Sequence, residues 1–243
     1  MSKKAVLLTI GNEILSGDVI DDNSNWIAKK LFSLGVELSY IFVIPDTKEI
    51  IKKFLIDYKD NFDFVITVGG MGPTPDDVTK DAIAEVFNVN LEKNNDIIEL
   101  IKKHYGNDVS EQKFLMAIFP QNAKPILTSE KNWAVGMINN NVFSFPGTPW
   151  LMKDAFLSIE DLLKDEPIFK TKININCEET IFADIMTDIC KKYPEVDVGS
   201  YPSNKDFRNV KILFKSRDKK KIIECRDEFV YLLSKRYTEL EIS

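Results

Sequence analysis

The chain has 243 residues, of which 44% are hydrophobic and 29% charged, a balance typical of a soluble globular protein of one large or two small domains. The net charge of −6 leaves no basic excess to neutralise phosphates, so no nucleic acid partner is expected. No apolar run approaches the length of a membrane span, so no membrane partner is expected either. The single histidine excludes a multi-histidine metal site, and three widely spaced cysteines favour reduced thiols in a cytoplasmic protein.

Strand-like runs alternate with helical patterns over the first 87 residues. The run AVLLTI at 5–10 is continuously apolar, as strands buried in a parallel sheet are. The alternation predicts strands at 5–10, 36–44 and 63–70 and helices at 23–35, 48–59 and 75–87. This order predicts an α/β fold with a doubly wound, mostly parallel sheet.

The middle of the chain continues this pattern. Residues 91–118 are expected to be helical, with a break around the stretch YGNDVS. A strand within 141–149 ends in a second loop of glycine and proline, and a helix is expected at 150–163.

A polar, proline-containing segment at 164–169 indicates a domain boundary. Beyond it a pattern of β-α-β-β-α begins, which is enough for a small two-layer unit. We therefore expect a nucleotide domain at residues 1–166 and a small α+β domain at 167–243.

Four loops leave the carboxyl ends of the predicted parallel strands. Ligands of open parallel sheets bind beyond these ends, so the four loops are expected to converge on one crevice. Each loop carries glycine, proline or acidic residues, and they span residues 10–24, 44–48, 68–77 and 145–150.

The third loop carries Gly69, Gly70 and Gly72 directly after a buried strand. No lysine follows at the spacing of a P-loop, and Pro75 stands where the dinucleotide-binding pattern needs glycine. Both of these phosphate-binding families are therefore excluded. The three glycines can still present backbone N–H groups to an anion at the start of the next helix.

Asp76 and Asp77 follow these glycines, and two interpretations remain open. In the first, both carboxylates cap the helix that begins near them and complement its dipole. In the second, the ligand is a phosphate that arrives with a divalent cation, which the carboxylates hold while the N–H groups bind phosphate oxygens. Further carboxylates on neighbouring loops could complete such a site, and these are Asp46, Glu13, Asp21 and Asp22.

The remaining loop residues each have a structural interpretation as well. Gly11 and Gly17 could serve only a turn, and Asn23 or Ser24 could cap the helix that follows them. Pro146 and Gly147 could be the central pair of a type II turn. Their occurrence at successive strand ends favours a functional interpretation for the group.

Taken together, the loops resemble the molybdopterin-binding fold of MogA and MoaB, the MoeA central domain and the N-terminal domain of CinA (competence/damage-inducible protein A). The likeness is strongest to the CinA branch and extends to the related half of eukaryotic FAD synthases. It rests on the segments GNEILSGDVIDDNSNWIAKKL, VGGMGPTPDDVTKDAIAEVF, FPGTPWLMKDAF and VDVGSYPS. Asn12 departs from the aspartate common there, and the amidase domain of many CinA proteins is not expected here.

This resemblance implies divalent-metal-dependent hydrolysis of a nucleotide pyrophosphate such as ADP-ribose or FAD, with Asp77 and Asp46 as the catalytic acidic pair. Acidic ligands with a single histidine suit Mg²⁺, Mn²⁺ or Co²⁺, and the metal site is expected to be drawn from Asp77, Asp46, Glu13, Asp21 and Asp76. Substrate and phosphate binding are expected of Gly69, Gly70, Gly72, Thr74, Gly11, Asn23, Ser24, Pro146, Gly147 and Thr148.

Two other functions remain open. One is adenylyl transfer to molybdopterin, as in the molybdenum cofactor branch, and the other is nucleotide binding without catalysis. The expected partner is a small nucleotide, and the families imply a homo-oligomer.

Overall fold

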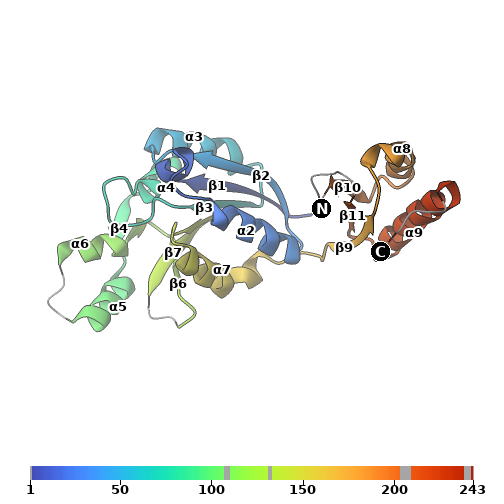
Figure 1. The fold of residues 1–243 in the computed structure, drawn as a ribbon. Helices are drawn as coiled ribbons and strands as arrows, with labels where there is room; N and C mark the ends of the chain where they lie inside the picture. The colour runs from blue at the N-terminus through green and yellow to red at the C-terminus, as the bar shows by residue number, and fades with distance from the viewer. Residues whose placement is uncertain (1, 107–109, 131–132, 203–208, 238–241, 243) are drawn as a thin grey trace. The chain divides into compact units, whose positions relative to one another are not determined.

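The structure, a computed structural model, describes residues 2–106, 110–130, 133–202, 209–237 and 242. The chain divides into two compact units, Met1–Asp165 (unit 1) and Glu166–Ser243 (unit 2), one residue before the boundary expected from the sequence (Figure 1). No helix within the described residues is long and apolar enough to cross a membrane.

The sheet of unit 1 runs in the order β2-β1-β3-β8-β7-β6. Strand β1 pairs in parallel with β2 and β3, and β3 pairs in parallel with β8, so the carboxyl ends of these four strands lie on one edge. Strands β7 and β6 continue the sheet in antiparallel pairs. The strands are β1 Lys4–Ile10, β2 Glu37–Ile44, β3 Phe64–Val68, β6 Lys124–Leu127, β7 Ala134–Asn139 and β8 Val142–Phe145.

Helices cover both faces of this sheet and give three layers. One apolar cluster joins a face of the sheet to α2 (Asp22–Ser33) and α7 (Pro149–Leu163). A second cluster joins the other face to α3 (Lys48–Tyr58), α4 (Thr79–Val86) and α5 (Asn95–Tyr105) (Figure 1). The burial of side chains on both faces explains the continuous apolar run of β1. The expected α/β architecture is confirmed.

The expectation for residues 91–118 was wrong in part. The segment starts with a strand, β4 (Leu91–Lys93), which pairs antiparallel with β5 (Ile118–Pro120). Helix α5 follows β4, and then come α6 (Glu111–Phe114) and a short 3-10 helix, η1 (Leu115–Ala117). The expected break falls partly on residues 107–109, which lie outside the described part. Strands β6 and β7 were not expected, although Asn140 and Asn141 form the turn of a β7–β8 hairpin and Asn140 has φ +52°.

Unit 2 has the expected β-α-β-β-α order. Its antiparallel sheet runs β10-β11-β9, and α8 and α9 pack on one face of it. Cys177 and Cys225 are buried in this unit, and both are free thiols. The elements are β9 Phe169–Ile175, the 3-10 helix η2 Glu179–Ile181, α8 Ala183–Lys192, β10 Asp197–Pro202, β11 Val210–Ser216 and α9 Lys219–Arg236.

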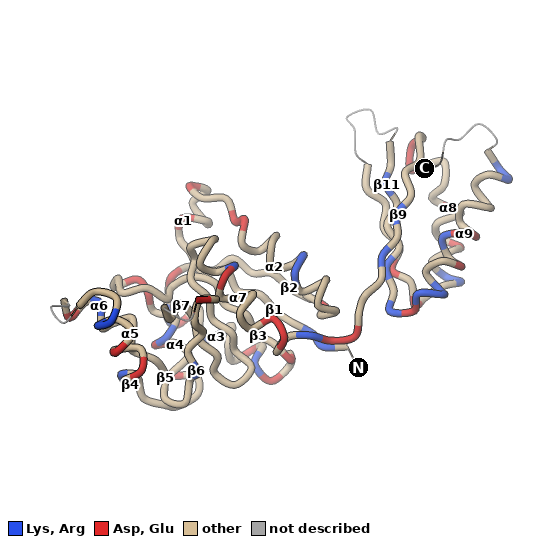
Figure 2. The backbone as a smooth tube through the Cα atoms, turned by 90° about the horizontal axis from the view of Figure 1, so that it is seen from below, with Lys and Arg blue, Asp and Glu red and all other residues tan. Residues whose placement is uncertain are grey.

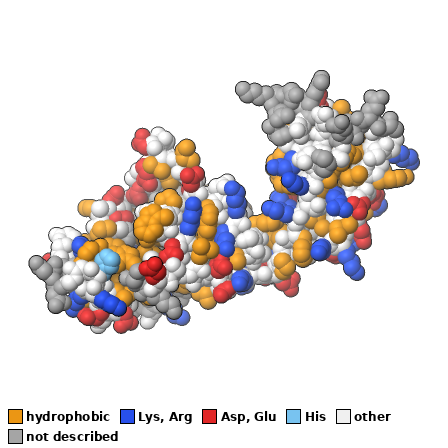
Figure 3. Space-filling model, turned by 60° about the horizontal axis from the view of Figure 1, so that its bottom comes forward, with side chains coloured by type: hydrophobic (Ala, Val, Ile, Leu, Met, Phe, Trp, Pro, Cys, Tyr) orange, Lys and Arg blue, Asp and Glu red, His pale blue; other side chains and the backbone are white. Residues whose placement is uncertain are grey.

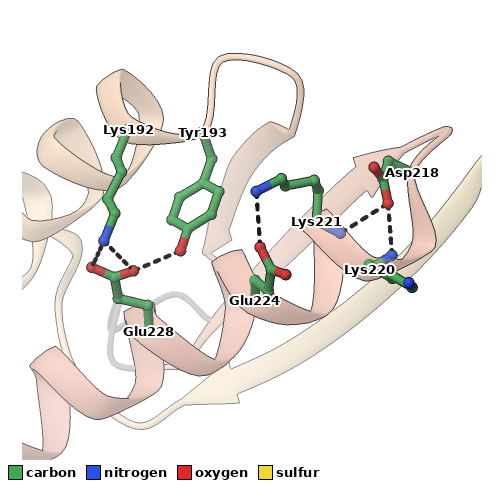
Figure 4. Close-up of polar contacts among 7 residues, drawn as sticks. All are labelled: Lys192, Tyr193, Asp218, Lys220, Lys221, Glu224 and Glu228. Atoms are coloured by element: carbon green, nitrogen blue, oxygen red, sulfur yellow. Dashed lines mark hydrogen bonds and ion pairs between the residues drawn. The ribbon is translucent and has the colours of Figure 1, made fainter.

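Polar contacts join α8 to α9 in unit 2 (Figure 4). Glu228 accepts hydrogen bonds from Lys192 Nζ and from the Tyr193 hydroxyl, each at 2.6 Å. The contact with Glu228 raises the pKa of Tyr193 to about 12, because ionising the phenol would place two negative charges together. Asp218 caps α9 by accepting the N–H groups of Lys220 and Lys221, so the run of three lysines at 219–221 forms the first turn of this helix.

Candidate functional site

The glycine loop between β3 and α4 leaves three consecutive backbone N–H groups without an acceptor. Gly69 N–H donates to Phe145 O at 3.0 Å, and Thr79 N–H donates to Gly70 O at 3.1 Å. Between these two bonds, the N–H groups of Gly70, Met71 and Gly72 donate to no acceptor within the described residues. Adjacent N–H groups of this kind form a concave site for an anion.

Two of these glycines are required by the backbone path. Gly69 has φ +105° and Gly70 has φ +63°, a region that side chains disfavour. A Cβ atom at Gly69 would also lie 2.1 Å from Ile10 O, and one at Gly70 would lie 2.3 Å from Thr79 Oγ1. The loop therefore runs directly against the end of β1 and the start of α4.

Asp76 and Asp77 do not cap α4, so the capping interpretation is wrong. Helix α4 begins at Thr79, and its N-cap, Val78, makes no side-chain bond. Asp77 Oδ2 instead accepts Thr74 N–H at 2.8 Å and Thr74 Oγ–H at 2.5 Å. This carboxylate folds over the glycine loop, since a Cβ at Gly72 would meet Asp77 Oδ2 at 2.6 Å. Asp76 is exposed.

In the first loop, Asp21 rather than Asn23 or Ser24 caps helix α2. Asp21 Oδ1 accepts Ser24 N–H at 3.0 Å, and its other oxygen accepts the Ser24 hydroxyl. Ser24 Oγ also lies 2.8 Å from Thr9 Oγ1, which ties α2 to the end of β1. The expected N-cap therefore exists, but it lies two or three residues before the positions expected from the sequence.

The same loop contains a short helix that was not expected, α1 (Asn12–Leu15). Its first residue is held from the neighbouring strand end, because Asp46 Oδ2 accepts Asn12 N–H at 2.8 Å. Glu13 lies over Gly11, where an added Cβ would meet Glu13 Oε1 at 2.6 Å. Gly17 has φ +82° with open space around it, so it serves a turn.

The loop between β8 and α7 lies against the glycine loop. A Cβ at Gly147 would lie 3.7 Å from Gly69 Cα. Gly147 does not have a positive φ, which the third residue of a type II turn requires, so the type II turn interpretation was wrong. Its carbonyl accepts Asn23 Nδ2–H at 2.7 Å, and Thr148 is the N-cap of α7. The first, third and fourth strand-end loops therefore meet.

An acidic cavity of about 470 Å³ lies on the β1 side of this meeting point. Its lining combines strand ends and loop residues with acidic residues of the first loop. In Figure 2 the backbone of Asp and Glu residues is red around α1. Asn23 is 7% exposed, and its Oδ1 has no hydrogen-bond partner. A buried acceptor without a donor is uncommon and marks a place where a ligand or a water can bind. The lining includes Thr9, Glu13, Asp18, Asp21, Asp22, Asn23 and Gly147.

A second cavity, of about 160 Å³, lies on the β7 side. Its lining is mostly apolar and includes Gly72, Pro146 and Thr148 from the two central loops. Lys80 lines it and is only 5% exposed. Burial lowers the pKa of the Lys80 ammonium, while Asp77 and Asp81 act against this shift.

Lys80 was not singled out from the sequence, although a signal existed. It precedes Ile83 and Ala84 by three and four residues, so helical periodicity places a lysine on the buried stripe of α4. A buried lysine is uncommon enough to indicate a function or a specific partner.

The five predicted metal ligands do not form a preassembled cage. Within the described residues, no group of three or more His, Cys, Asp or Glu side chains is arranged to hold a metal ion. The residues do fit a second mode, in which Mg²⁺ is held by one or two carboxylates together with the phosphates of a substrate. Asp46 and Asp77 each use Oδ2 in the hydrogen bonds described above and keep Oδ1 for such a role.

Comparisons with known proteins agree with this fold and its two units. A family described as "Probable molybdopterin binding domain" matches residues 6–165, and one described as "FAD synthase, middle domain" matches residues 167–241. A protein of Archaeoglobus fulgidus is 31% identical, over 94% of this chain and 97% of its own.

Two further matches carry a more specific description. A CinA-like protein of Thermosipho melanesiensis is 31% identical over 98% of this chain, which spans 59% of that protein's length. The crystal structure of "the protein CinA with unknown function from Thermoplasma acidophilum" is 29% identical with a TM-score of 0.61, and covers 67% of this chain and 98% of that one. The chain therefore belongs to the molybdopterin-binding domain family, in its CinA-like branch.

Proposed function

We propose that the protein hydrolyses a nucleotide pyrophosphate, of the ADP-ribose or FAD class, in a reaction that depends on a divalent cation. The observation that carries this proposal is the set of three N–H groups at Gly70, Met71 and Gly72 that have no acceptor in the described chain. These N–H groups lie beside carboxylates. The carboxylates would repel a bare anion, but they would not repel a phosphate that is bound together with its cation.

The glycine loop would bind the pyrophosphate and stabilise the transition state. Its N–H groups are fixed by the hydrogen bonds on either side, so they need no rearrangement as charge develops on phosphate oxygens. Preorganised donors of this kind supply much of the rate enhancement in reactions that develop negative charge. The amino end of α7 points into the same region and adds its positive dipole end.

Asp77 and Asp46 would hold the cation through their Oδ1 atoms and orient the attacking water. When bound, the cation would polarise the phosphate and lower the pKa of a bound water. Water attack on one phosphorus breaks the bond to the bridging oxygen, and with ADP-ribose it gives AMP and ribose 5-phosphate. Thr74 keeps Asp77 in place through its two hydrogen bonds.

The acidic cavity would receive part of the nucleotide. Asn23 Oδ1 offers a buried acceptor for a ribose hydroxyl, and its Nδ2 already holds Gly147 O. Glu13 and Asp22 at the rim would contact the cation or its water shell.

Product chromatography tests this proposal. The metal-stripped protein is incubated with ADP-ribose, FAD, NAD or ATP, with and without Mg²⁺, Mn²⁺ or Co²⁺. AMP formed only with a cation supports the proposal and names the preferred substrate. Adenylyl transfer to a pterin with no release in water favours a transferase instead, and binding with no product under any cation favours a non-catalytic role.

A further inference from the structure

The apolar cavity on the β7 side of the glycine loop contains a buried cation that the proposed hydrolysis does not use. Lys80 is 5% exposed and lines this cavity. Its Nζ donates to Leu115 O at 3.0 Å and lies 5.8 Å from the centre of the Phe119 ring. An ammonium group has three N–H donors, and within the described residues only Leu115 accepts one.

The other walls of this cavity suit a flat, apolar group. Met71, Met116, Phe119, Trp133 and Leu151 line the cavity together with Lys80 and give it thioether, aromatic and aliphatic surfaces. Trp133 is held in turn by the His104 ring at 5.3 Å and the Tyr105 ring at 5.5 Å. Figure 3 shows hydrophobic side chains gathered around the pale-blue histidine on this face of unit 1. Small-molecule sites have this composition, mostly apolar with a few placed polar groups.

The size of the cavity restricts what can enter. Pockets for whole ligands are about 300–1,000 Å³, and this cavity is about half of the lower limit, at about 160 Å³. It therefore fits one ring system rather than a complete nucleotide. Gly72, Pro146 and Thr148 of the two central loops also line it, so a group in the cavity could belong to the same ligand that the glycine loop binds.

We propose that this cavity binds the planar heteroaromatic ring of the nucleotide substrate, and that Lys80 Nζ donates a hydrogen bond to a nitrogen or carbonyl acceptor on the ring edge. This proposal rests on the proposed function and assigns its ring subsite. Lys80 is then a specificity-determining residue. A ligand without an acceptor at this position would leave the remaining N–H donors of Lys80 unpaired in a buried site, which costs binding free energy. Rings with an acceptor edge, such as adenine or a flavin, are favoured over a sugar phosphate without a ring.

Binding of ring compounds that lack phosphate tests the subsite separately from the chemistry. Calorimetry measures the affinity of the full chain for adenosine and for riboflavin, in the wild type, in Lys80→Met and in Lys53→Met. Lys53 is an exposed lysine of α3 and serves as the matched control. We expect Lys80→Met to weaken binding of the preferred ring compound roughly 10- to 100-fold, as for a hydrogen bond with one charged partner, and Lys53→Met to leave it unchanged.

Lys80→Met also removes the hydrogen bond to Leu115 O and could alter the fold, so a second variant is needed. Leu151→Trp leaves Lys80 in place and fills the cavity, whereas Leu157→Trp places the same side chain on an exposed part of α7. Only the first is expected to abolish ring binding. The proposal is overturned if all four variants bind the ring compound as tightly as the wild type does. It is also overturned if the wild type binds neither ring compound at millimolar concentration.

The failure of this proposal can be distinguished from a failure of the proposed function. Inorganic pyrophosphate with Mg²⁺ tests the glycine loop alone, and Lys80→Met is expected to bind it as the wild type does. If Lys80→Met loses pyrophosphate as well, Lys80 supports the phosphate loop rather than the ring, and the ring subsite is refuted. Ring binding that depends on Lys80, with no pyrophosphate binding by the wild type, supports the subsite and refutes the proposed function.

Discussion

The two cavities beside the glycine loop differ in nearly every property, although one loop separates them. The β1 side holds about 470 Å³ and is lined by carboxylates, including Glu13 and Asp21. The β7 side holds about 160 Å³ and is lined by apolar side chains with one buried ammonium, that of Lys80. The Pro146–Thr148 segment contributes to both linings. Under the proposed function, the two cavities would receive different parts of the same ligand.

The largest expected effect comes from removing charge on the acidic side. Asp77→Asn keeps an oxygen that can accept Thr74 N–H but removes the negative charge that would hold the cation. We expect pyrophosphate hydrolysis to fall about 10²- to 10⁴-fold with little change in the thermal unfolding midpoint. Asp60→Asn, in the exposed turn after α3, is the matched control and should keep full activity. Full activity of Asp77→Asn would show that the charge of Asp77 does not hold a catalytic cation.

The second largest effect is expected from a substitution that displaces the glycine loop. Gly70→Ala adds a Cβ that meets Thr79 Oγ1 at 2.3 Å on a residue with φ +63°, and it displaces the free N–H groups. Gly17→Ala introduces a similar left-handed strain, at φ +82°, but into open space. Each should lose about 1–2 kcal/mol of unfolding free energy from backbone strain, and Gly70→Ala more because of the contact.

Binding of pyrophosphate then separates these two glycine variants. We expect Gly70→Ala to weaken it at least about 10-fold, through the loss of one or more hydrogen bonds to a charged group, and Gly17→Ala to leave it unchanged. Equal affinity in both variants would show that the glycine loop does not bind the phosphates.

A smaller effect is expected at the contact between the first and fourth loops. Asn23→Leu removes the bond from Nδ2 to Gly147 O and also removes the buried Oδ1 that has no partner. We expect affinity for ADP-ribose to fall roughly 10-fold, with affinity for inorganic pyrophosphate unchanged because the glycine loop is intact. Equal losses for both ligands would mean that Asn23 only supports the loops.

The smallest effect is expected from an ion-pair cluster on α4, the helix that follows the glycine loop. Glu85 of α4 binds Lys48 and Lys52 of α3 at 2.6 Å each, and these bonds lower the pKa of Glu85 to about 2. A carboxylate with a lowered folded-state pKa stabilises the protein above its unfolded value, near 4.5, and loses this contribution as the pH falls from there towards 2.

Glu85→Gln should therefore flatten the acid limb of stability between pH 4.5 and 2, and denaturant midpoints over this range measure it. The effect should be small because the pair is exposed to solvent. Affinity for pyrophosphate at neutral pH should not change, and a change would show that α4 transmits strain to the loop.

Much of the layer structure could be predicted from the sequence, because it depends on local periodicity. The continuous apolar run of β1 and the helical stripes of α2 and α3 each show which faces are buried. Strands β6 and β7 were missed although each pairs with the strand next to it in the sequence, and the Asn140–Asn141 turn between β7 and β8 was a local signal that could have shown the second hairpin. The strand β4 was assigned to a helix because the strand that stabilises it, β5, lies 25 residues or more away in the sequence.

For the candidate site, glycines, prolines and acids in the sequence already indicated the loops at the strand ends, at Gly69, Asp46 and Gly147. The contacts that those residues make were decided by the tertiary structure. Asp77 pairs with Thr74 instead of capping α4, because α4 starts later than its pattern indicates. Lys80 lies in an apolar cavity only because Phe119, Trp133 and Leu151 arrive from three other segments of the chain. Cap positions and cavities depend on side chains distant in sequence, so local patterns cannot fix them.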